Sequence, residues 1–546
     1  MKVDCYPISV LPRLSRLFLD YAAGREPLAP FFSATPFTSA FPIPPQDPTL
    51  RSSVADLLLH QNQSWNAGPA ALAGIEKLRQ GAGAFVTGQQ VALFTGPLFT
   101  LLKAATVIHR AKLSNSVPIF WLASEDHDLA EADHVTLPTR HALQTLKLNH
   151  QAAQAAQLVG NLPVGNLPLG HGITVVLDRA AELIGGTPEF DLLTACYTPD
   201  ATFASAFARF LSAVFADHGL VVIDASTRAF HALGAPVLRH AIEHAAELEA
   251  ALHDRDKLLA ERGYHSQVLV APGSSLLFLL DEETGARIPL RRKNGAWSTT
   301  HPGAPSGVGV SGTAKTSYST ADLLAILDAA PERLSPNALL RPVFQDYLLP
   351  TQAIVGGPAE IAYYAQNQVL YQAILGRTTP VLPRLSATLI EPAVAKILDQ
   401  YQLSLEDILA AHPDELAHRL GARSLPVEGK LKLAAAGNAL DAEIDALLAW
   451  CESLDPSLAR SAQVSASKMR YQMNRLRRLA ASYQLQRDAG IRRHVDALSF
   501  NLFPDRHPQE RTIGGVAYLS RYGTQLLATL VDQATPDCPG HKAIWL

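Results

Sequence analysis

A strand, a helix and a second strand follow one another between residues 84 and 123, and this order constrains the fold more than any other feature of the sequence. Residues 84–87 (AFVT) and 118–123 (PIFWLA) are short apolar runs. Between them, Gly96 and Pro97 precede apolar residues at helical spacing up to Leu113. Proline is favoured at the first helical position, and a strand buried on both faces is apolar throughout. The segment therefore predicts a βαβ unit with two parallel strands.

The same alternation continues along the chain. A helix is predicted at residues 201–218, with a strand after it at 220–224. Further strands are predicted at residues 266–271 (SQVLVA), 275–280 (SLLFLL) and 351–355 (TQAIV). Alternating strands and helices are typical of an α/β fold with a parallel sheet. We therefore expect residues 1–385 to form a Rossmann-like, doubly wound core with connecting insertions.

The composition changes after Pro383, where helix-forming residues dominate. Two runs repeat at the spacing of a coiled-coil seam: Leu440, Ile444, Leu447, Cys451 and Leu454, then Met469, Gln472, Leu476, Leu479 and Tyr483. Pro456 separates them, and the first run is acidic whereas the second is rich in arginine. We therefore predict an α-helical coiled-coil domain at residues 386–500, either as a hairpin within one chain or as an arm that forms a homodimer. Residues 501–546 are expected to pack back near the core.

The composition also limits where the chain works and what it binds. Its 546 residues carry a formal net charge of −4, which provides no basic field for nucleic acid. It contains no apolar stretch of about 18 residues that could span a membrane, and prolines and charges interrupt the N-terminus, unlike a signal peptide. Cys5, Cys196, Cys451 and Cys538 are far apart and form no C-x-x-C pair. We therefore expect a cytoplasmic protein with free thiols and with no membrane or nucleic-acid partner.

The densest cluster of reactive side chains follows the strand at residues 118–123. Ser124, Glu125, Asp126, His127 and Asp128 stand at its carboxyl end, where ligands bind in open α/β sheets. Carboxylates can bind an ammonium group, and an imidazole can accept a proton. We therefore predict that Asp126 and His127 are catalytic and that Glu125 and Asp128 bind substrate. Two alternatives stay open: Asp126 or Asp128 could cap the next helix, or the cluster could hold a divalent metal.

A glycine and two amides end the neighbouring strand. Gly88, Gln89 and Gln90 are interpreted as a substrate-binding turn, in which glycine allows close approach of a ligand and the amides offer uncharged donors and acceptors. Because the ends of adjacent parallel strands meet at one edge of a sheet, this turn and the cluster around His127 are expected to converge on one pocket. Lys103, in the helix that follows, is assigned to solvent or an interface rather than to a phosphate or carboxylate partner.

Polar residues interrupt the apolar stretch at residues 331–364. The predicted substrate-binding residues here are Asn337, Arg341, Gln345, Gly357 and Glu360. Arginine can bind a carboxylate through two parallel hydrogen bonds. A glutamate in the first turn of a helix is also favoured by the helix dipole, so a structural role for Glu360 stays open.

A polar loop at residues 501–511 adjoins the arginine-rich helix. Arg506, Gln509 and Arg511 could hold a phosphate-bearing ligand there, although an ordinary salt-bridged loop would have a similar composition. The chain lacks a phosphate-binding P-loop, a dinucleotide-binding glycine motif, a nucleophile elbow and an H-E-x-x-H pair.

Five blocks of the sequence together resemble one known family. In order, they are FVTGQQVALFTGPLFTLLKA, PIFWLASEDHDLAEADHV, ERLSPNALLRPVFQDYLLPT, IVGGPAEIAYYAQ and LFPDRHPQER. In these blocks, from about residue 84 to 511, the chain is similar to the cysteine-adding enzymes of bacillithiol biosynthesis.

The resemblance implies both an architecture and an activity. It implies a core similar to that of class I aminoacyl-tRNA synthetases, a coiled-coil domain that dimerises, and a nucleotide site near the coiled coil, which we assign to Arg506, Gln509 and Arg511. It also implies a ligase that couples L-cysteine to the amine of glucosaminyl-malate in the last step of the pathway, with ATP or ADP as a ligand. We predict no metal cofactor, because one local cluster does not make a coordination sphere. Residues 87–90 (TGQQ) replace the histidine motif of the synthetases. The way in which the cysteine carboxylate is activated therefore stays open.

Two other classes of function compete with the ligase. The acidic cluster could serve a metal-dependent hydrolase, in which case a metal would bind at residues 125–128. The coiled coil could serve a non-catalytic scaffold, in which case the core would lack a crevice with convergent polar groups.

Overall fold

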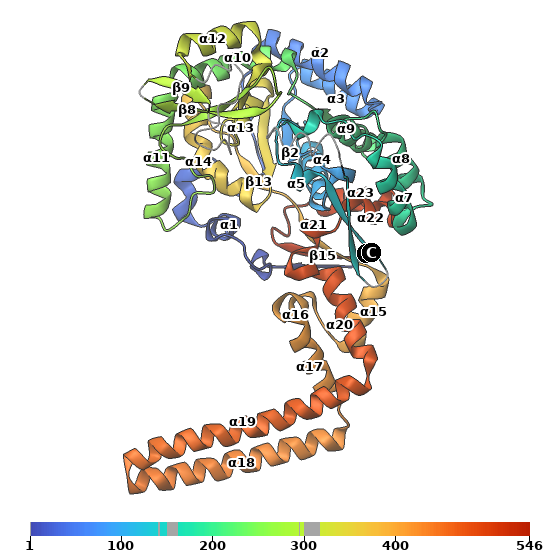
Figure 1. The fold of residues 1–546 in the computed structure, drawn as a ribbon, viewed down its shortest axis with the longest axis vertical. Coiled ribbons are helices and arrows are strands. Elements are labelled where there is room, and N and C mark those ends of the chain that lie inside the picture. Colours follow the sequence, from blue (N-terminus) through green and yellow to red (C-terminus); the bar gives the residue numbers. More distant parts are fainter. Residues whose placement is uncertain (1, 140–141, 150–161, 294, 300–316) are drawn as a thin grey trace.

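A five-stranded parallel sheet forms the centre of the N-terminal region (Figure 1). The computed structural model describes residues 2–139, 142–149, 162–293, 295–299 and 317–546. In spatial order the strands are β13 (Val381–Pro383), β12 (Thr351–Gly356), β2 (Ala84–Gln90), β3 (Val117–Ala123) and β6 (Val221–Ile223). All neighbouring strands are parallel. This order is that of a Rossmann fold, in which the direction of winding reverses between β2 and β12.

Side chains of the sheet alternate between two hydrophobic cores. Phe85 and Phe120 point into one core, whereas Val86 and Ile119 point into the other. The helices on the first side are α4 (Phe99–Leu113), α7 (Gly172–Ile184), α8 (Pro188–Cys196), α9 (Phe203–Val214), α22 (Gly515–Tyr522) and α23 (Gln525–Gln533). Those on the second side are α1 (Arg16–Ala22), α2 (Pro48–Ser64), α3 (Pro69–Arg79), α10 (Arg228–Glu243), α11 (Ala245–Glu261), α12 (Thr320–Ala329), α13 (Arg341–Leu348) and α14 (Pro358–Leu375). The predicted doubly wound core is confirmed.

Two antiparallel sheets are inserted into this core. A hairpin of β4 (His134–Pro138) and β5 (Leu143–Lys147) follows β3. The larger sheet contains, in spatial order, β10 (Ser317–Tyr318), β9 (Ala296–Thr299), β8 (Arg287–Lys293), β7 (Ser274–Leu280) and β11 (Leu334–Pro336). The strand predicted at residues 275–280 lies within β7, but the strand predicted at 266–271 is wrong. The backbone N–H and C=O of Val268 bond instead to the side-chain amide of Gln366 in α14, at 2.8 and 2.9 Å.

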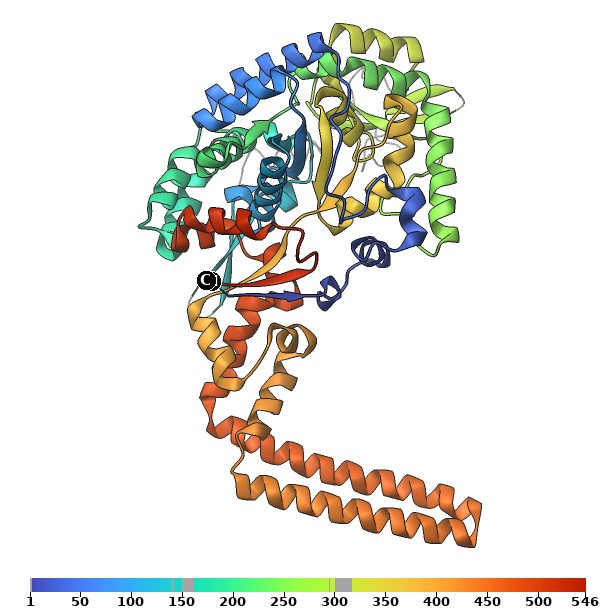
Figure 2. The same cartoon turned by 180° about the vertical axis from the view of Figure 1, so that it is seen from behind.

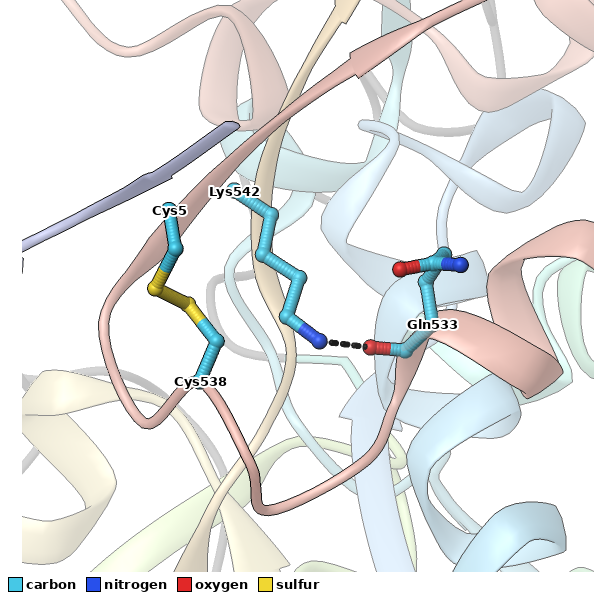
Figure 3. The surroundings of a disulfide bond; sticks show 4 residues. All are labelled: Cys5, Gln533, Cys538 and Lys542. Atoms are coloured by element: carbon cyan, nitrogen blue, oxygen red, sulfur yellow. Dashed lines mark hydrogen bonds between the residues drawn. A yellow bond between two sulfur atoms is a disulfide. The ribbon is translucent and has the colours of Figure 1, made fainter. Parts of the chain in front are cut away.

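The two ends of the chain meet in a separate sheet. Its central strand, β15 (His541–Trp545), pairs antiparallel with β1 (Val3–Tyr6) and parallel with β14 (Ser386–Ile390). Next to it, Cys5 and Cys538 form a disulfide with their Cα atoms 6.1 Å apart (Figure 3). The prediction of free thiols is therefore wrong for this pair. Their 533-residue separation in sequence leaves no local spacing signal, and only the pairing of β1 with β15 brings them together.

Two long helices project from the rest of the molecule as a hairpin (Figures 1 and 2). They are α18 (Val427–Leu454) and α19 (Pro456–Arg487), and Arg470 links them through Asp441 at 2.8 Å and Asp445 at 2.6 Å. At the base of the hairpin, α15 (Pro392–Tyr401), α16 (Leu405–Ala410), α17 (Pro413–Arg423) and α20 (Ala489–Leu502) share a small core of their own. The prediction of a hairpin within one chain is confirmed. Across the described ranges, no helix has the length and apolar character needed to cross a membrane.

The two long helices meet along only part of the predicted seam. Ile444 of α18, a predicted seam residue, and Ala466 of α19 are buried, whereas Ala481 of α19 packs against Gly421 of α17. The predicted seam residues Leu447, Leu454, Met469, Leu476, Leu479 and Tyr483 are between 41% and 60% exposed. Their assignment to the hairpin seam is wrong because small residues form the contact instead. A Cβ on Gly437 would lie 1.8 Å from the guanidinium of Arg477. These six residues and Trp450 therefore remain as exposed apolar side chains, which we call the apolar stripe.

Candidate active site

A cavity of about 650 Å³ opens at the carboxyl ends of β2, β3 and β12. This is the edge of the sheet at which the winding reverses, where Rossmann folds bind ligands. The predicted site residues that line it are Gly88, Gln89, Gln90, Glu125, Asp126, His127, Asn337, Arg341, Gly357, Glu360 and Arg511. The expected convergence of the β2 end and the cluster around His127 on one pocket is therefore confirmed.

The residues Gly88, Gln89 and Gln90 are the last three of β2, so their interpretation as a turn is wrong. All three still pair with β3. A Cβ on Gly88 would lie 3.0 Å from the carbonyl oxygen of Trp121, so the glycine allows close packing between strands. Gln90 donates from Nε2 to the carbonyl oxygen of Asp128 at 2.8 Å, which joins the end of β2 to the loop after β3.

Lys103 of α4 is buried against the cavity, contrary to its assignment to solvent or an interface. Its ammonium group donates to the carbonyl oxygen of Gly88 at 2.7 Å and to Oε1 of Gln89 at 2.9 Å. It also lies 2.5 Å from Oε2 of Glu360. Glu360 in turn accepts a hydrogen bond from the backbone N–H of Gly357 at 2.8 Å, which caps the first turn of α14. Lys103 thus joins β2, α4 and α14 at the floor of the cavity, and burial lowers its pKa.

The cluster after β3 divides into two parts. Asp128 caps α5 (Leu129–Ala132) by accepting from the backbone N–H of Glu131 at 3.3 Å, and its side chain does not line the cavity. The capping alternative therefore holds for Asp128. At the other end of the cluster, the hydroxyl of Ser124 donates to Asp224 at 2.5 Å, which anchors the loop to the end of β6. Burial raises the pKa of Asp224.

His127 and Asp126 lie between these anchors and face the cavity. The backbone N–H of His127 donates to Oδ1 of Asp126 at 2.8 Å. Nδ1 of His127 is buried, and no group in the described part of the chain forms a hydrogen bond with it. Burial lowers the pKa of His127, so its imidazole is neutral near pH 7. The side chain is 34% exposed, and a neutral imidazole at the cavity wall can accept a proton from a bound substrate.

Arg341, at the start of α13, and Asn337, just after β11, also line the cavity. Arg341 donates to Oε1 of Gln345 at 3.0 Å, and Gln345 donates to Asp346 at 3.0 Å. Gln345 is 1% exposed and does not line the cavity, so it positions Arg341 and its prediction as a substrate ligand is wrong. Oδ1 of Asn337 accepts from the backbone N–H groups of Leu339 and Leu340, which fixes its side chain at the cavity wall.

The three residues predicted to bind a nucleotide do not form one site. Gln509 is buried, and its amide is used by the backbone of Leu389 and by the carbonyl oxygen of Asn501. Arg506 donates to the carbonyl oxygen of Ala411, away from the cavity lining. Among the three, Arg511 alone lines the cavity. These three residues do not fit a shared nucleotide site, because the side-chain amide of Gln509 already forms hydrogen bonds with backbone groups.

A buried ionic network joins the cavity to the sheet of the chain ends. Arg384 and Glu510 form an ion pair at 2.7 Å, and both side chains are 4% exposed. Glu510 also accepts from the backbone N–H of Ala387 at 2.9 Å. Arg384 lines the cavity, so Glu510 stabilises the cavity wall from behind.

His541 lies beside this network, and acid is expected to destabilise the fold through it. Its two ring nitrogens contact the hydroxyls of Ser386 and Thr388 at 2.8 and 2.9 Å, and burial lowers its pKa to about 4. The folded pKa lies below the ordinary value of 6.5. The contribution of neutral His541 is therefore complete above about pH 6.5 and is lost as the pH falls towards 4. Denaturation midpoints measured across this range should fall less for His541→Gln than for the wild type. Parallel curves would contradict this assignment.

Three cationic side chains line the cavity although the sequence did not predict them there. They are Lys103, Arg287 and Arg384. Arg287 extends from β8, where it donates to Oγ of Ser335 at 2.8 Å and to the carbonyl oxygen of Pro336 at 2.6 Å. The burial of Lys103 could have been inferred because Phe99, one turn earlier in the same helix, is apolar. No local pattern marks the other two.

The cavity combines charges of both signs. The cations are Lys103, Arg287, Arg341, Arg384 and Arg511, and the acids are Glu125, Asp126, Glu131 and Glu360. Such a lining suits a ligand that carries both ammonium and carboxylate groups. These convergent polar groups also argue against a scaffold without a site. Within the residues that the structure describes, no three His, Cys, Asp or Glu side chains are placed to hold a metal ion.

Comparisons with known proteins give a consistent result along the whole chain. Residues 1–385 match the family model described as "Bacillithiol biosynthesis BshC, N-terminal Rossmann-like domain". Residues 387–546 match the one described as "Bacillithiol biosynthesis BshC, C-terminal coiled-coil domain". A protein of Koribacter versatilis named "Putative cysteine ligase BshC" is 41% identical, with 99% of each chain covered. A protein of the same name from Solibacter usitatus is 33% identical, with 100% of each chain covered.

A solved structure shows a much weaker similarity. It is described as a putative arginyl-tRNA synthetase from Campylobacter jejuni, and the match covers 88% of this chain and 98% of that one. The sequence identity is 10% and the TM-score is 0.20, which is too low to bear on the fold or the activity.

Proposed function

Because the chain belongs to the BshC family of bacillithiol biosynthesis, we propose that it joins the carboxyl group of L-cysteine to the amine of glucosaminyl-malate. The product would be an amide, and the reaction would be the last step of the pathway. The mixed-charge cavity at the edge of the parallel sheet carries this proposal. Cysteine is a zwitterion, and glucosaminyl-malate combines an amine with two carboxylates. A cavity with five cations and four acids can bind both molecules side by side.

The chemistry requires a neutral amine and an activated carboxyl group. An ammonium group has no lone pair, so a proton must leave before or during attack on the cysteine carbonyl carbon. The neutral imidazole of His127 is suited to accept it, and Asp126 accepts a hydrogen bond from the backbone N–H of His127. The cationic side chains are suited to hold the malate carboxylates and the negative charge that develops on the attacked carboxyl oxygen.

The carboxyl group of cysteine must also be activated before the amide can form. A free carboxylate does not form an amide because hydroxide is a poor leaving group. The family resemblance implies ATP or ADP as a ligand, and we propose Arg511 as the member of the predicted trio that contacts its phosphates. We assign no reaction step to the nucleotide.

Thiol profiling of a deletion strain tests the proposed function in the cell. Loss of the gene should remove the cysteine-containing thiol and lead to accumulation of glucosaminyl-malate. Complementation with the intact gene should restore the thiol. Unchanged thiols in the deletion strain would contradict the proposed function.

We also propose that two copies of the chain associate through the coiled-coil hairpin. The apolar stripe supports this proposal, because its large apolar side chains on the two helices are exposed. Leu476 lines a groove on the hairpin together with Leu440, Met469 and Met473. A second hairpin packed on this groove would remove Met469 and Leu476 of the stripe from water.

Light scattering checks the dimer directly. The purified protein should give twice the chain mass of 58.7 kDa. Leu476→Glu combined with Leu479→Glu should give the mass of one chain, because two charges would be buried in the interface. Gln463→Glu, on the same helix but outside the stripe, is the matched control and should stay dimeric. A wild-type protein of single-chain mass at micromolar concentration would contradict the proposal.

A further inference from the structure

A fully buried histidine lies directly behind the cavity. His231 of α10 is 0% exposed, and its Nε2 lies 3.2 Å from Oε1 of Glu125, whose side chain is 22% exposed. On the other side of the ring, Nδ1 lies 3.0 Å from the carbonyl oxygen of Leu334 in β11. Glu125 therefore separates His231 from the cavity, and the three groups form a line that runs from the backbone of β11 to the cavity.

The packing of α10 holds the imidazole in this line. Gly234 lies one turn after His231, and a Cβ there would be 2.1 Å from the ring of Phe344 in α13. The glycine therefore lets Phe344 approach the helix, and the Phe344 ring centroid lies 5.5 Å from that of His231. Because the ring is fully buried and both nitrogens lie next to oxygen atoms, it has little freedom to turn.

The partners of the two ring nitrogens determine the charge of His231. A carbonyl oxygen can only accept, so Nδ1 of His231 must carry a proton. Nε2 is buried 3.2 Å from a carboxylate oxygen of Glu125 and has no hydrogen-bond partner among the described residues, so the contact is an ion pair, in which a second proton on Nε2 avoids two opposed lone pairs. The favoured state is an imidazolium beside an ionised Glu125.

We propose that Glu125 is the carboxylate that binds a protonated amino group of a substrate, and that His231 is the positioning residue that keeps this carboxylate ionised and directed into the cavity. This inference rests on the proposed function and deepens it, because both substrates of the ligation carry an amino group. His231 does not touch the substrate. It acts through Glu125, as an outer partner orients a ligand-binding side chain.

The charges around Glu125 support this assignment. Burial alone would raise the pKa of Glu125, but His231, Arg287 and Arg341 outweigh it and leave the pKa below its ordinary value. Burial would lower the pKa of His231, but Glu125 outweighs it and leaves that pKa raised. The titratable and charged groups that face the pair are Arg287 from β8, Arg341 from α13, Asp126 from the same loop and Asp224 from the end of β6. Removal of the imidazolium should therefore let burial raise the pKa of Glu125.

Calorimetric titration of the full-length protein tests the pair without requiring turnover. L-cysteine and glucosaminyl-malate are each titrated into the wild type and into His231→Gln at about pH 6 and about pH 8. A hydrogen bond to a charged group corresponds to about 10–100-fold in affinity. We expect His231→Gln to weaken the binding of one of the two ligands by about tenfold or more at about pH 6. We expect a smaller loss at about pH 8, where a larger fraction of Glu125 is ionised in the variant.

Three further variants separate positioning from folding. His231→Asn keeps a donor for Leu334 and should lose affinity in the same way. Glu125→Gln should weaken the same ligand at both pH values, and His231→Gln should add nothing to it in the double variant. His240→Gln, on the same helix but outside the cavity lining, is the matched control and should bind normally.

The outcomes distinguish this inference from the proposed function. Normal affinity for both ligands in folded His231→Gln and His231→Asn would overturn the inference and leave the ligase proposal intact. Additive losses in the double variant would also overturn it. Absence of an amide product from the wild type would contradict the proposed function, whereas the calorimetric result would still decide whether the pair binds an amine.

Discussion

Replacing His127 by alanine is expected to lower the rate of amide formation by about 10²–10⁴-fold, the usual contribution of a general base. The partly exposed imidazole lines the cavity, and burial lowers its pKa so that it is neutral near pH 7. Asp126→Asn should also slow the reaction, because it removes a charge at the cavity wall while keeping the shape of the side chain. Both side chains are partly exposed, so melting temperatures should change little. Turnover and melting are measured on the same samples.

Asp128→Ala is the matched control for these two variants. Asp128 belongs to the same loop but caps α5 and does not line the cavity. Its removal should cost about 0.5–2 kcal/mol of stability, and the folded protein should retain its rate. If His127→Ala and Asp126→Asn both turn over at the normal rate, the catalytic assignment is wrong and passes to Asn337, Arg341 and Glu360.

Replacing Glu510 by glutamine is expected to destabilise the protein by about 3–5 kcal/mol, because it leaves the buried guanidinium of Arg384 without its counter-charge. Glutamine keeps the shape of the side chain, so the loss reports the missing charge rather than a cavity. Since Arg384 also lines the active-site cavity, substrate affinity should fall as well. Chemical denaturation of the variant and the wild type measures the difference in the free energy of unfolding.

An exposed ion pair provides the comparison for Glu510. Glu428 and Lys432 lie 2.7 Å apart on α18, with side chains 79% and 76% exposed. Glu428→Gln should change stability by less than about 0.5 kcal/mol, since solvent screens such pairs. Equal losses for Glu428→Gln and Glu510→Gln would contradict the view that burial makes the Arg384–Glu510 pair important.

The parts of the fold that were predictable follow from short-range patterns. The apolar runs at β2, β3 and β12 are continuous because both faces of these strands are buried. Their parallel arrangement then places the strand ends at one edge. This is why the convergence of Gln89 with His127 could be predicted before any contact was known.

The errors arose where tertiary contacts replace local ones. Residues 266–271 have the composition of a strand, but the side chain of Gln366 satisfies the backbone of Val268. The spacing of Met469, Leu476 and Leu479 fits a seam, but these side chains are exposed and the smaller Ala466 is buried instead. His231, Arg287 and Arg384 come from elements far from the motifs. Only the folded chain reveals that Arg287 and Arg384 line the cavity and that His231 lies behind it.

The reaction itself is the most direct test of the central claim. Purified protein is incubated with L-cysteine, glucosaminyl-malate and ATP, and the mixture is analysed by mass spectrometry. Our account predicts a product whose mass equals the sum of cysteine and glucosaminyl-malate minus one water, formed by the wild type and strongly reduced in His127→Ala. Absence of this product from folded wild-type protein supplied with all three compounds would contradict the account.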